Sequence, residues 1–152
     1  MGRRWALWLD LAVKAALVGL LLFAVARPDL PQFHGKAMVA RALLYPISAL
    51  IVPVVWWLRG RPRPYPYALD ILLVLPFLID VAGNAANLYD TIGWWDDLNH
   101  FVNWAFLVAA FGQLLLGDLA LGLAGSTLAA ALTVTILWPT RVRPAASRAG
   151  AR

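Results

Sequence analysis

The residues most able to do chemistry in this chain are gathered in one short stretch, residues 80–103. The stretch holds four of the eight acidic residues, four asparagines and one of the two histidines. Asp80, Asn84 and Asn87 are spaced i, i+4 and i+7, so they share one face of a helix, and Asp90 lies in the polar connection that follows. The sequence therefore predicts a polar stripe at the end of one helix.

A second polar stripe is expected on the next helix. Asp96, Asn99, His100 and Asn103 are spaced i, i+3, i+4 and i+7, and Asp97 can reach His100 from three positions before it. The connection between the two helices is short, so we expect antiparallel neighbours with both stripes close together near the outer face of the membrane.

The chemistry of these side chains allows several uses. Ionisable groups at membrane depth are costly, and the cost indicates a function. Carboxylates with one imidazole and no sulfur suit a divalent metal such as Mg, Mn, Zn or Fe, with Asp80, Asp97 and His100 as candidate ligands. A His–Asp pair can also serve as a general base or proton relay. A structural interpretation stays open, in which Asp96 and Asp97 satisfy the first turn of their helix and the asparagines bridge helices.

The composition indicates a membrane protein. The chain has 152 residues, of which 62% are hydrophobic and 14% charged, against about 45–50% and about 25% in soluble domains. Without cysteine, disulfides, thiolate metal sites and a cysteine nucleophile are excluded. The net charge of +5 comes from arginines beside apolar runs, which points to the lipid bilayer rather than nucleic acid as the partner.

The apolar runs predict an all-α, multi-pass transmembrane bundle of about five helices in a single domain. The expected spans are residues 5–26, 42–58, 67–87, 96–116 and 119–138, followed by a basic tail, residues 139–152. Pro46, Pro53 and Pro76 should distort their helices. Asp10 and Lys14 are four residues apart and should pair on one face of the first span.

Two features of the topology stay open. Residues 5–26 could instead be a signal peptide, because two arginines precede an apolar core that ends in Ala24-Val25-Ala26. With five spans and a cytoplasmic N-terminus, five Lys and Arg residues near span ends lie inside and seven lie outside, four of them in the tail. The positive-inside rule is then violated, so the side of the membrane that holds the C-terminus stays open.

The run from Leu69 to Trp104 resembles the YjdF-like family of bacterial inner-membrane proteins, whose function is unknown. The matching features are a helix that ends in Asp and Gly-Asn, a Tyr-Asp turn, a Trp-Trp-Asp element and His-Phe. In this sequence they correspond to Asp80, Gly83, Asn84, Tyr89, Asp90, Trp94, Trp95, Asp96 or Asp97, and His100. The family has a further helix with a Trp-Glu-x-x-Glu element, whereas this chain contains no glutamate. The resemblance implies a shortened member that lacks one helix, located in the bacterial inner membrane.

Three functions follow as expectations. The first is a membrane protein whose outward polar cluster binds an ion or a small polar ligand, and which would need to form a homo-oligomer to act as a carrier. The second is a metal-dependent enzyme that acts on a lipid headgroup. The third is a non-catalytic subunit or remnant, in which the polar stripes only connect helices.

Overall fold

The computed structural model describes residues 2–62 and 64–116, and these residues form an all-α bundle without strands. Three segments are long and apolar enough to cross a membrane: Arg4–Ala26, Met38–Leu58 and Tyr67–Ala85. The expected all-α, multi-pass architecture is confirmed. The expected fifth span, residues 119–138, and the tail lie outside the described residues.

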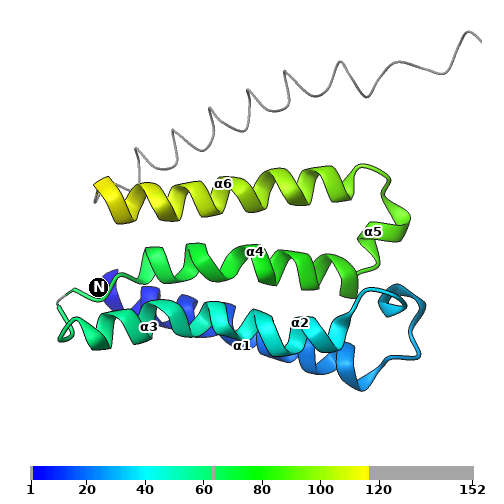
Figure 1. Cartoon of the computed structure of the whole chain (residues 1–152), viewed down its shortest axis with the longest axis horizontal. Coiled ribbons are helices and arrows are strands. Elements are labelled where there is room, and N and C mark those ends of the chain that lie inside the picture. The colour runs from blue at the N-terminus through cyan, green and yellow to red at the C-terminus, as the bar shows by residue number, and fades with distance from the viewer. Residues whose placement is uncertain (1, 63, 117–152) are drawn as a thin grey trace, which may run out of the picture.

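Helix α4 (Tyr67–Ala85) is the centre of the bundle, and it packs against α1 (Gly2–Ala26), α3 (Ser48–Leu58) and α6 (Trp95–Leu116) (Figure 1). The main core joins α1 to α4. Leu17 and Leu21, one turn apart on α1, are buried with Val74 and Val81 of α4. Many large apolar side chains, such as Leu22 and Leu58, are exposed on the outside. An apolar exterior around buried polar groups is the arrangement that a lipid environment favours.

The second span is broken near its middle. Helix α2 (Met38–Leu44) is followed by a 3₁₀ turn, η2 (Tyr45–Ile47), and then by α3. Pro46 lies in that turn, which is the distortion expected where proline removes a backbone donor from the helix. The helical span begins at Met38 and not at residue 42 as predicted, so Arg41 lies inside it.

The chain reverses direction between α4 and α6. Helix α4 ends at Ala85, and Asn87 adopts a left-handed conformation with φ of 58° before the short helix α5 (Leu88–Thr91). Helix α6 then runs back along α4 (Figure 1). Leu72 is buried against Ala109 and Ala110, whose small side chains allow the two helices to approach closely. The predicted antiparallel pair is confirmed, although the first helix ends two residues before the predicted residue 87.

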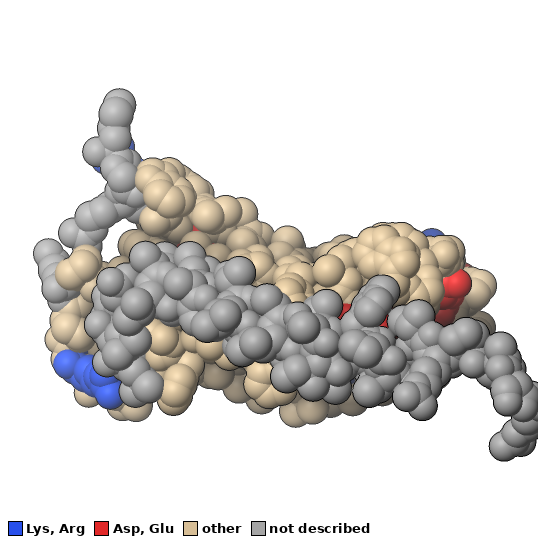
Figure 2. Space-filling model, turned by 90° about the horizontal axis from the view of Figure 1, so that it is seen from above, with Lys and Arg blue, Asp and Glu red and all other residues tan. Residues whose placement is uncertain are grey.

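Charged side chains are distributed unevenly along the bundle. The connection between α3 and α4 lies at the same end as the N-terminus, and α5 lies at the opposite end (Figure 1). On the face shown in Figure 2, the largest basic patch lies at the α3–α4 end, and the largest acidic patch lies at the α5 end beside a smaller basic spot.

Candidate functional site

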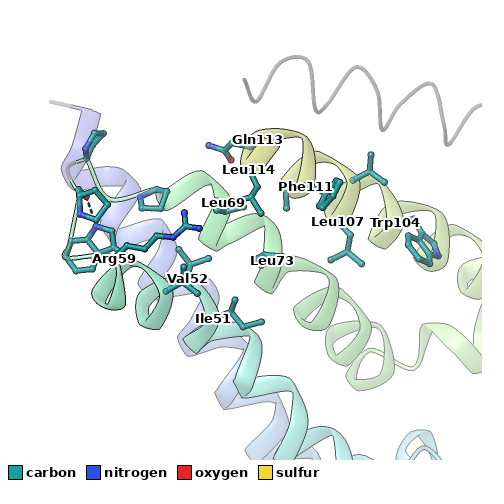
Figure 3. Close-up of a pocket in the computed structure, with 17 residues that line it drawn as sticks. Ile51, Val52, Arg59, Leu69, Leu73, Trp104, Leu107, Phe111, Gln113 and Leu114 are labelled. Atoms are coloured by element: carbon teal, nitrogen blue, oxygen red, sulfur yellow. Dashed lines mark hydrogen bonds between the residues drawn. The ribbon is translucent and has the colours of Figure 1, made fainter. Parts of the chain in front are cut away.

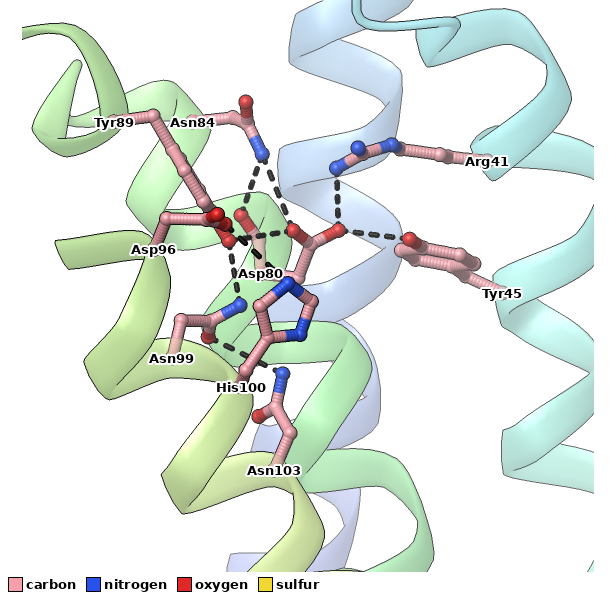
Figure 4. Close-up of polar contacts among 9 residues, drawn as sticks. All are labelled: Arg41, Tyr45, Asp80, Asn84, Tyr89, Asp96, Asn99, His100 and Asn103. Carbon is pink, nitrogen blue, oxygen red and sulfur yellow. Dashed lines mark hydrogen bonds and ion pairs between the residues drawn. The ribbon is translucent and has the colours of Figure 1, made fainter. Parts of the chain in front are cut away.

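Asp80 is the centre of a polar network at the α5 end of α4 (Figure 4). Its side chain keeps only 15% exposure. The carboxylate accepts hydrogen bonds on one oxygen from Arg41 and from the Tyr45 hydroxyl, the latter at 2.8 Å. The other oxygen accepts one from the Tyr89 hydroxyl at 2.7 Å and lies 3.4 Å from Asn84 Nδ2. Both oxygens are thus occupied by groups from α2, η2, α4 and α5.

The network continues onto α6 through two amide side chains. Asn99 is buried and donates from Nδ2 to the Tyr89 hydroxyl at 2.6 Å. Asn103 donates in turn to the Asn99 side-chain oxygen at 3.2 Å. The oxygen of Asn103 is buried without a hydrogen-bond partner. The stripe of Asn99 and Asn103 therefore faces α4 and retains unused hydrogen-bonding capacity.

A pocket of about 460 Å³ lies beside this network. Its polar lining residues are Lys36, Arg41, Tyr45, Asp80, Asn84, Tyr89, Asp96, Asn99, His100 and Asn103. Its apolar lining is Pro76, Phe77 and Leu107. The pocket is open on one side, where Asp96 and His100 stand exposed.

Most charges around the pocket are paired with one another. Arg41 is paired with Asp80, and Lys36 Nζ lies 2.8 Å from a carboxylate oxygen of Asp90. His100 Nε2 lies 3.5 Å from Asp96 Oδ1, with both side chains about two-thirds exposed. The pocket thus offers amide and hydroxyl groups beside two ion pairs, Arg41–Asp80 and Lys36–Asp90, and beside the His100–Asp96 contact, which is ionic only when His100 is protonated.

The phenol of Tyr89 is perturbed by its position, which lies outside the membrane-spanning segments. Burial, and then the hydrogen bond that it donates to Asp80, raise the pKa of Tyr89 above its ordinary value, because ionisation would place a second anion beside the carboxylate. Tyr89 therefore stays a neutral donor at physiological pH.

The three candidate metal ligands are not gathered as a ligand set. Within residues 2–62 and 64–116, no group of three or more His, Cys, Asp or Glu side chains is placed to hold a metal ion. Asp80 uses both oxygens in its hydrogen bonds, and Asp97 is not among the residues that line the pocket with Asp80 and His100. The prediction of Asp80, Asp97 and His100 as a divalent-metal site is thus not supported by the geometry.

The other predicted residues are divided between the pocket and its surroundings. Asn84, Asp96, Asn99 and Asn103 line the pocket together with Asp80 and His100. Asn87 does not continue the stripe on α4, because the helix has ended and its backbone is left-handed. Asp90 lies on α5 and does not line the pocket. It is paired with Lys36, which does.

Sequence reasoning missed the groups that hold Asp80. The candidate residues predicted from the sequence include neither Arg41 nor Tyr45, which both bond to Asp80. A signal was present, because Arg41 lies in an apolar run and an intramembrane arginine needs an anionic partner. Tyr45 lies four residues after Arg41 and therefore on the same helix face.

A larger pocket, of about 800 Å³, lies between α3, α4 and α6 near the other end of the bundle (Figure 3). Its walls are mostly apolar and include Ile51, Val52, Leu73, Leu107 and Phe111. In a membrane, an apolar surface of this kind faces lipid chains. We therefore assign the candidate site to the smaller, polar pocket.

No protein-family model, curated protein or solved structure matches this chain.

Proposed function

We propose that the chain is a multi-pass protein of a bacterial inner membrane, akin to the YjdF-like family, and that it binds a small uncharged polar ligand in the pocket beside Asp80. The observation that carries the proposal is that Asn103 lines the pocket while its side-chain oxygen is buried without a hydrogen-bond partner. Buried polar atoms are normally paired, so a missing partner indicates a place for one.

The charges of the pocket favour an uncharged ligand. Arg41 and Lys36 are neutralised by Asp80 and Asp90, so neither provides an unpaired charge for an anion. The Asp80 carboxylate already accepts from three side chains of other elements, so it provides little for a cation. Hydroxyl or amide groups on a ligand can both donate and accept hydrogen bonds, so they would match the side-chain oxygen of Asn103 and the side-chain NH₂ groups of Asn99 and Asn103. The ligand class is therefore a polyol, a sugar or an amide.

The pocket wall also has an apolar side that suits such a ligand. Pro76, Phe77 and Leu107 line the pocket together with the polar groups. Pockets that hold small molecules combine apolar walls with a few placed polar groups. The carbon skeleton of a sugar or polyol would pack against these residues.

The proposal is tested by thermal unfolding of the purified protein in nanodiscs. The probes are glycerol, myo-inositol, glucose and acetamide at millimolar concentration, with sodium acetate and ammonium chloride as charged comparisons. At least one neutral probe should raise the melting temperature of the wild type. The Asn103→Leu variant should lose this shift. The matched control is Gln113→Leu: the Gln113 side-chain oxygen is also buried without a hydrogen-bond partner, but the residue lines the larger, apolar pocket, so this variant should keep the shift.

Other outcomes overturn the proposal. A shift with the charged probes alone would show that the ligand is an ion. If no probe shifts the wild type while Asn103→Leu still lowers the melting temperature, the network serves only to hold the helices together.

A further inference from the structure

A second ionic cluster lies near the opposite end of α4 from the ligand pocket. Lys14 Nζ of α1 lies 3.1 Å from Asp10 Oδ2 and 2.5 Å from Asp70 Oδ2 of α4. The hydroxyl of Tyr65, which precedes α4, donates a hydrogen bond to Asp70. The i, i+4 pair expected within α1 is thus present, and a second carboxylate from α4 shares its lysine.

The cluster is removed from water. The side chain of Asp70 is fully buried, and those of Asp10 and Lys14 keep 6% and 18% exposure. Asp10 is six residues into the candidate span that begins at Arg4, which corresponds to a depth of about 9 Å. The second oxygen of each carboxylate, Oδ1, is buried without a hydrogen-bond partner. Two acceptors are therefore unused in a place where water does not reach them.

The charges of the cluster do not balance. Asp10 and Asp70 bring two carboxylates, whereas Lys14 brings one ammonium group. Within residues 2–62 and 64–116, the Tyr65 phenol is hydrogen-bonded to Asp70, and the ring of Tyr65 contacts that of Tyr67.

The neighbouring helices bring no charge that would correct this imbalance. Helix α3 (Ser48–Leu58) has no ionisable side chain, and neither do residues 104–116 of α6, which pack against the start of α4. With both carboxylates ionised and Lys14 protonated, the three side chains of the cluster would carry a net charge of −1.

We infer that Asp10, Lys14 and Asp70 form a proton-binding site in which the two carboxyl groups together retain one proton at neutral pH. Two carboxylates that share one site do not ionise together easily, because each disfavours the charge of the other. One added proton leaves one carboxylate for one ammonium group and makes the cluster neutral. It also turns one of the two unused acceptor oxygens into a hydroxyl donor.

A proton fits this site better than a metal cation. Metal cations such as Ca²⁺ or Mg²⁺ need several oxygen ligands, and the cluster has two unused oxygens, Oδ1 of Asp10 and Oδ1 of Asp70. Lys14 already occupies the position between the two Oδ2 atoms. A proton needs only one oxygen. The inference is independent of the ligand pocket, which uses Asp80 and not Asp70.

Infrared spectroscopy of the full chain in nanodiscs tests the inference, because a protonated carboxyl group has a C=O stretch that an ionised carboxylate lacks. Spectra are recorded at pH 7 in H₂O and in D₂O, with choline as the only cation and again with sodium added. The variants are Asp10→Asn and Asp70→Asn. Each variant leaves one carboxylate for Lys14. If one variant does not fold, the other still tests the inference. Asp29→Asn is the matched control, because Asp29 is exposed and paired with Arg27.

The wild type and Asp29→Asn should show a carboxyl C=O band that shifts in D₂O, corresponding to one protonated group per chain. Asp10→Asn and Asp70→Asn should both lose it. Absence of the band in the folded wild type overturns the inference, and so does its persistence in both variants. Loss of the band when sodium is added would show that the site prefers a monovalent cation, which also overturns it.

Discussion

Arg41 of α2 and Asp80 of α4, which are 39 residues apart in the chain, form an ion pair inside the bundle. Tyr45 and Tyr89 complete the contacts of the same carboxylate from η2 and α5. One side chain of α4 therefore connects the broken second span to the turn that leads into α6. All four residues line the polar pocket.

Replacement of Arg41 by methionine should destabilise the protein strongly. The change leaves the Asp80 charge without its cation in a poorly hydrated place, where breaking an ion pair costs about 3–5 kcal/mol. The double variant Arg41→Met/Asp80→Asn should be more stable than Arg41→Met alone, because it leaves no unpaired charge. Urea or SDS unfolding in detergent, followed by circular dichroism, measures these differences.

The control for this prediction is Arg27→Met, which removes an exposed ion pair with Asp29. It should leave the free energy of unfolding nearly unchanged. Equal losses for Arg27→Met and Arg41→Met would contradict the role given to the Arg41–Asp80 pair.

Replacement of Lys14 by methionine should also be destabilising, by about 3 kcal/mol or more, because Asp10 and Asp70 then lose the only cation that they share. Lowering the pH should restore part of this stability, since protonation removes the unpaired charges. Thermal unfolding between pH 5 and pH 8 in nanodiscs provides the measurement. Lys36→Met, which removes the ion pair with the exposed Asp90, is the matched control and should show a much smaller loss.

Gly83 should not tolerate a side chain. A Cβ atom at this position would lie 2.5 Å from Trp95 Nε1 and 3.0 Å from the Tyr89 ring. Gly83→Ala should therefore displace the start of α6 and cost about 1–3 kcal/mol. Gly19→Ala is the control, because that glycine lies in α1 with open space around it. Thermal unfolding gives the stability, and a change in tryptophan emission confined to Gly83→Ala would report the displacement. Equal behaviour of the two variants would refute the close packing.

Tyr65 and Tyr89, which lie outside the spans, should ionise only at a pH above the ordinary pKa of tyrosine. Burial and hydrogen bonds to aspartate raise the pKa of Tyr89 and of Tyr65 above the ordinary value of about 10. The folded state thus holds these protons more tightly than the unfolded state, so this contribution to stability is complete below pH 10 and is lost as the pH rises further. Ultraviolet titration of phenolate in the wild type, Tyr89→Phe and Tyr65→Phe checks this. Each variant should lack one phenol that ionises above pH 10 in the wild type. If the phenol that the variant lacks ionises near pH 10 in the wild type, the raised pKa is contradicted.

The arrangement of the connections can be tested with single cysteines, because the natural chain has none. Arg59 lies at the α3–α4 end, and His34 and Gly93 lie in the connections at the other end. If the basic α3–α4 loop is cytoplasmic, a membrane-impermeant maleimide should label cysteines at 34 and 93 in intact cells. A cysteine at 59 should react only after the membrane is opened. Labelling of 34 and 59 from the same side would contradict the bundle.

The sequence by itself determined the features that depend on neighbours along the chain. Apolar runs of span length identified the helices, and Pro46 marked the break in the second span. Helical spacing paired Asp10 with Lys14 and Asp80 with Asn84. These features follow from the geometry of one helix, in which residues four apart are always close.

Only the tertiary structure decided which helix faces meet. Asp70 stands in the first turn of α4, and the packing of α1 against α4 buries it beside Lys14. Arg41 precedes the start predicted at residue 42, yet it lies within the second span and neutralises Asp80. Periodicity gives the direction of a side chain around its own helix axis, but not the rotation of that helix against its neighbours. That rotation is set by the packing of the whole bundle, and it decides which distant charges become partners.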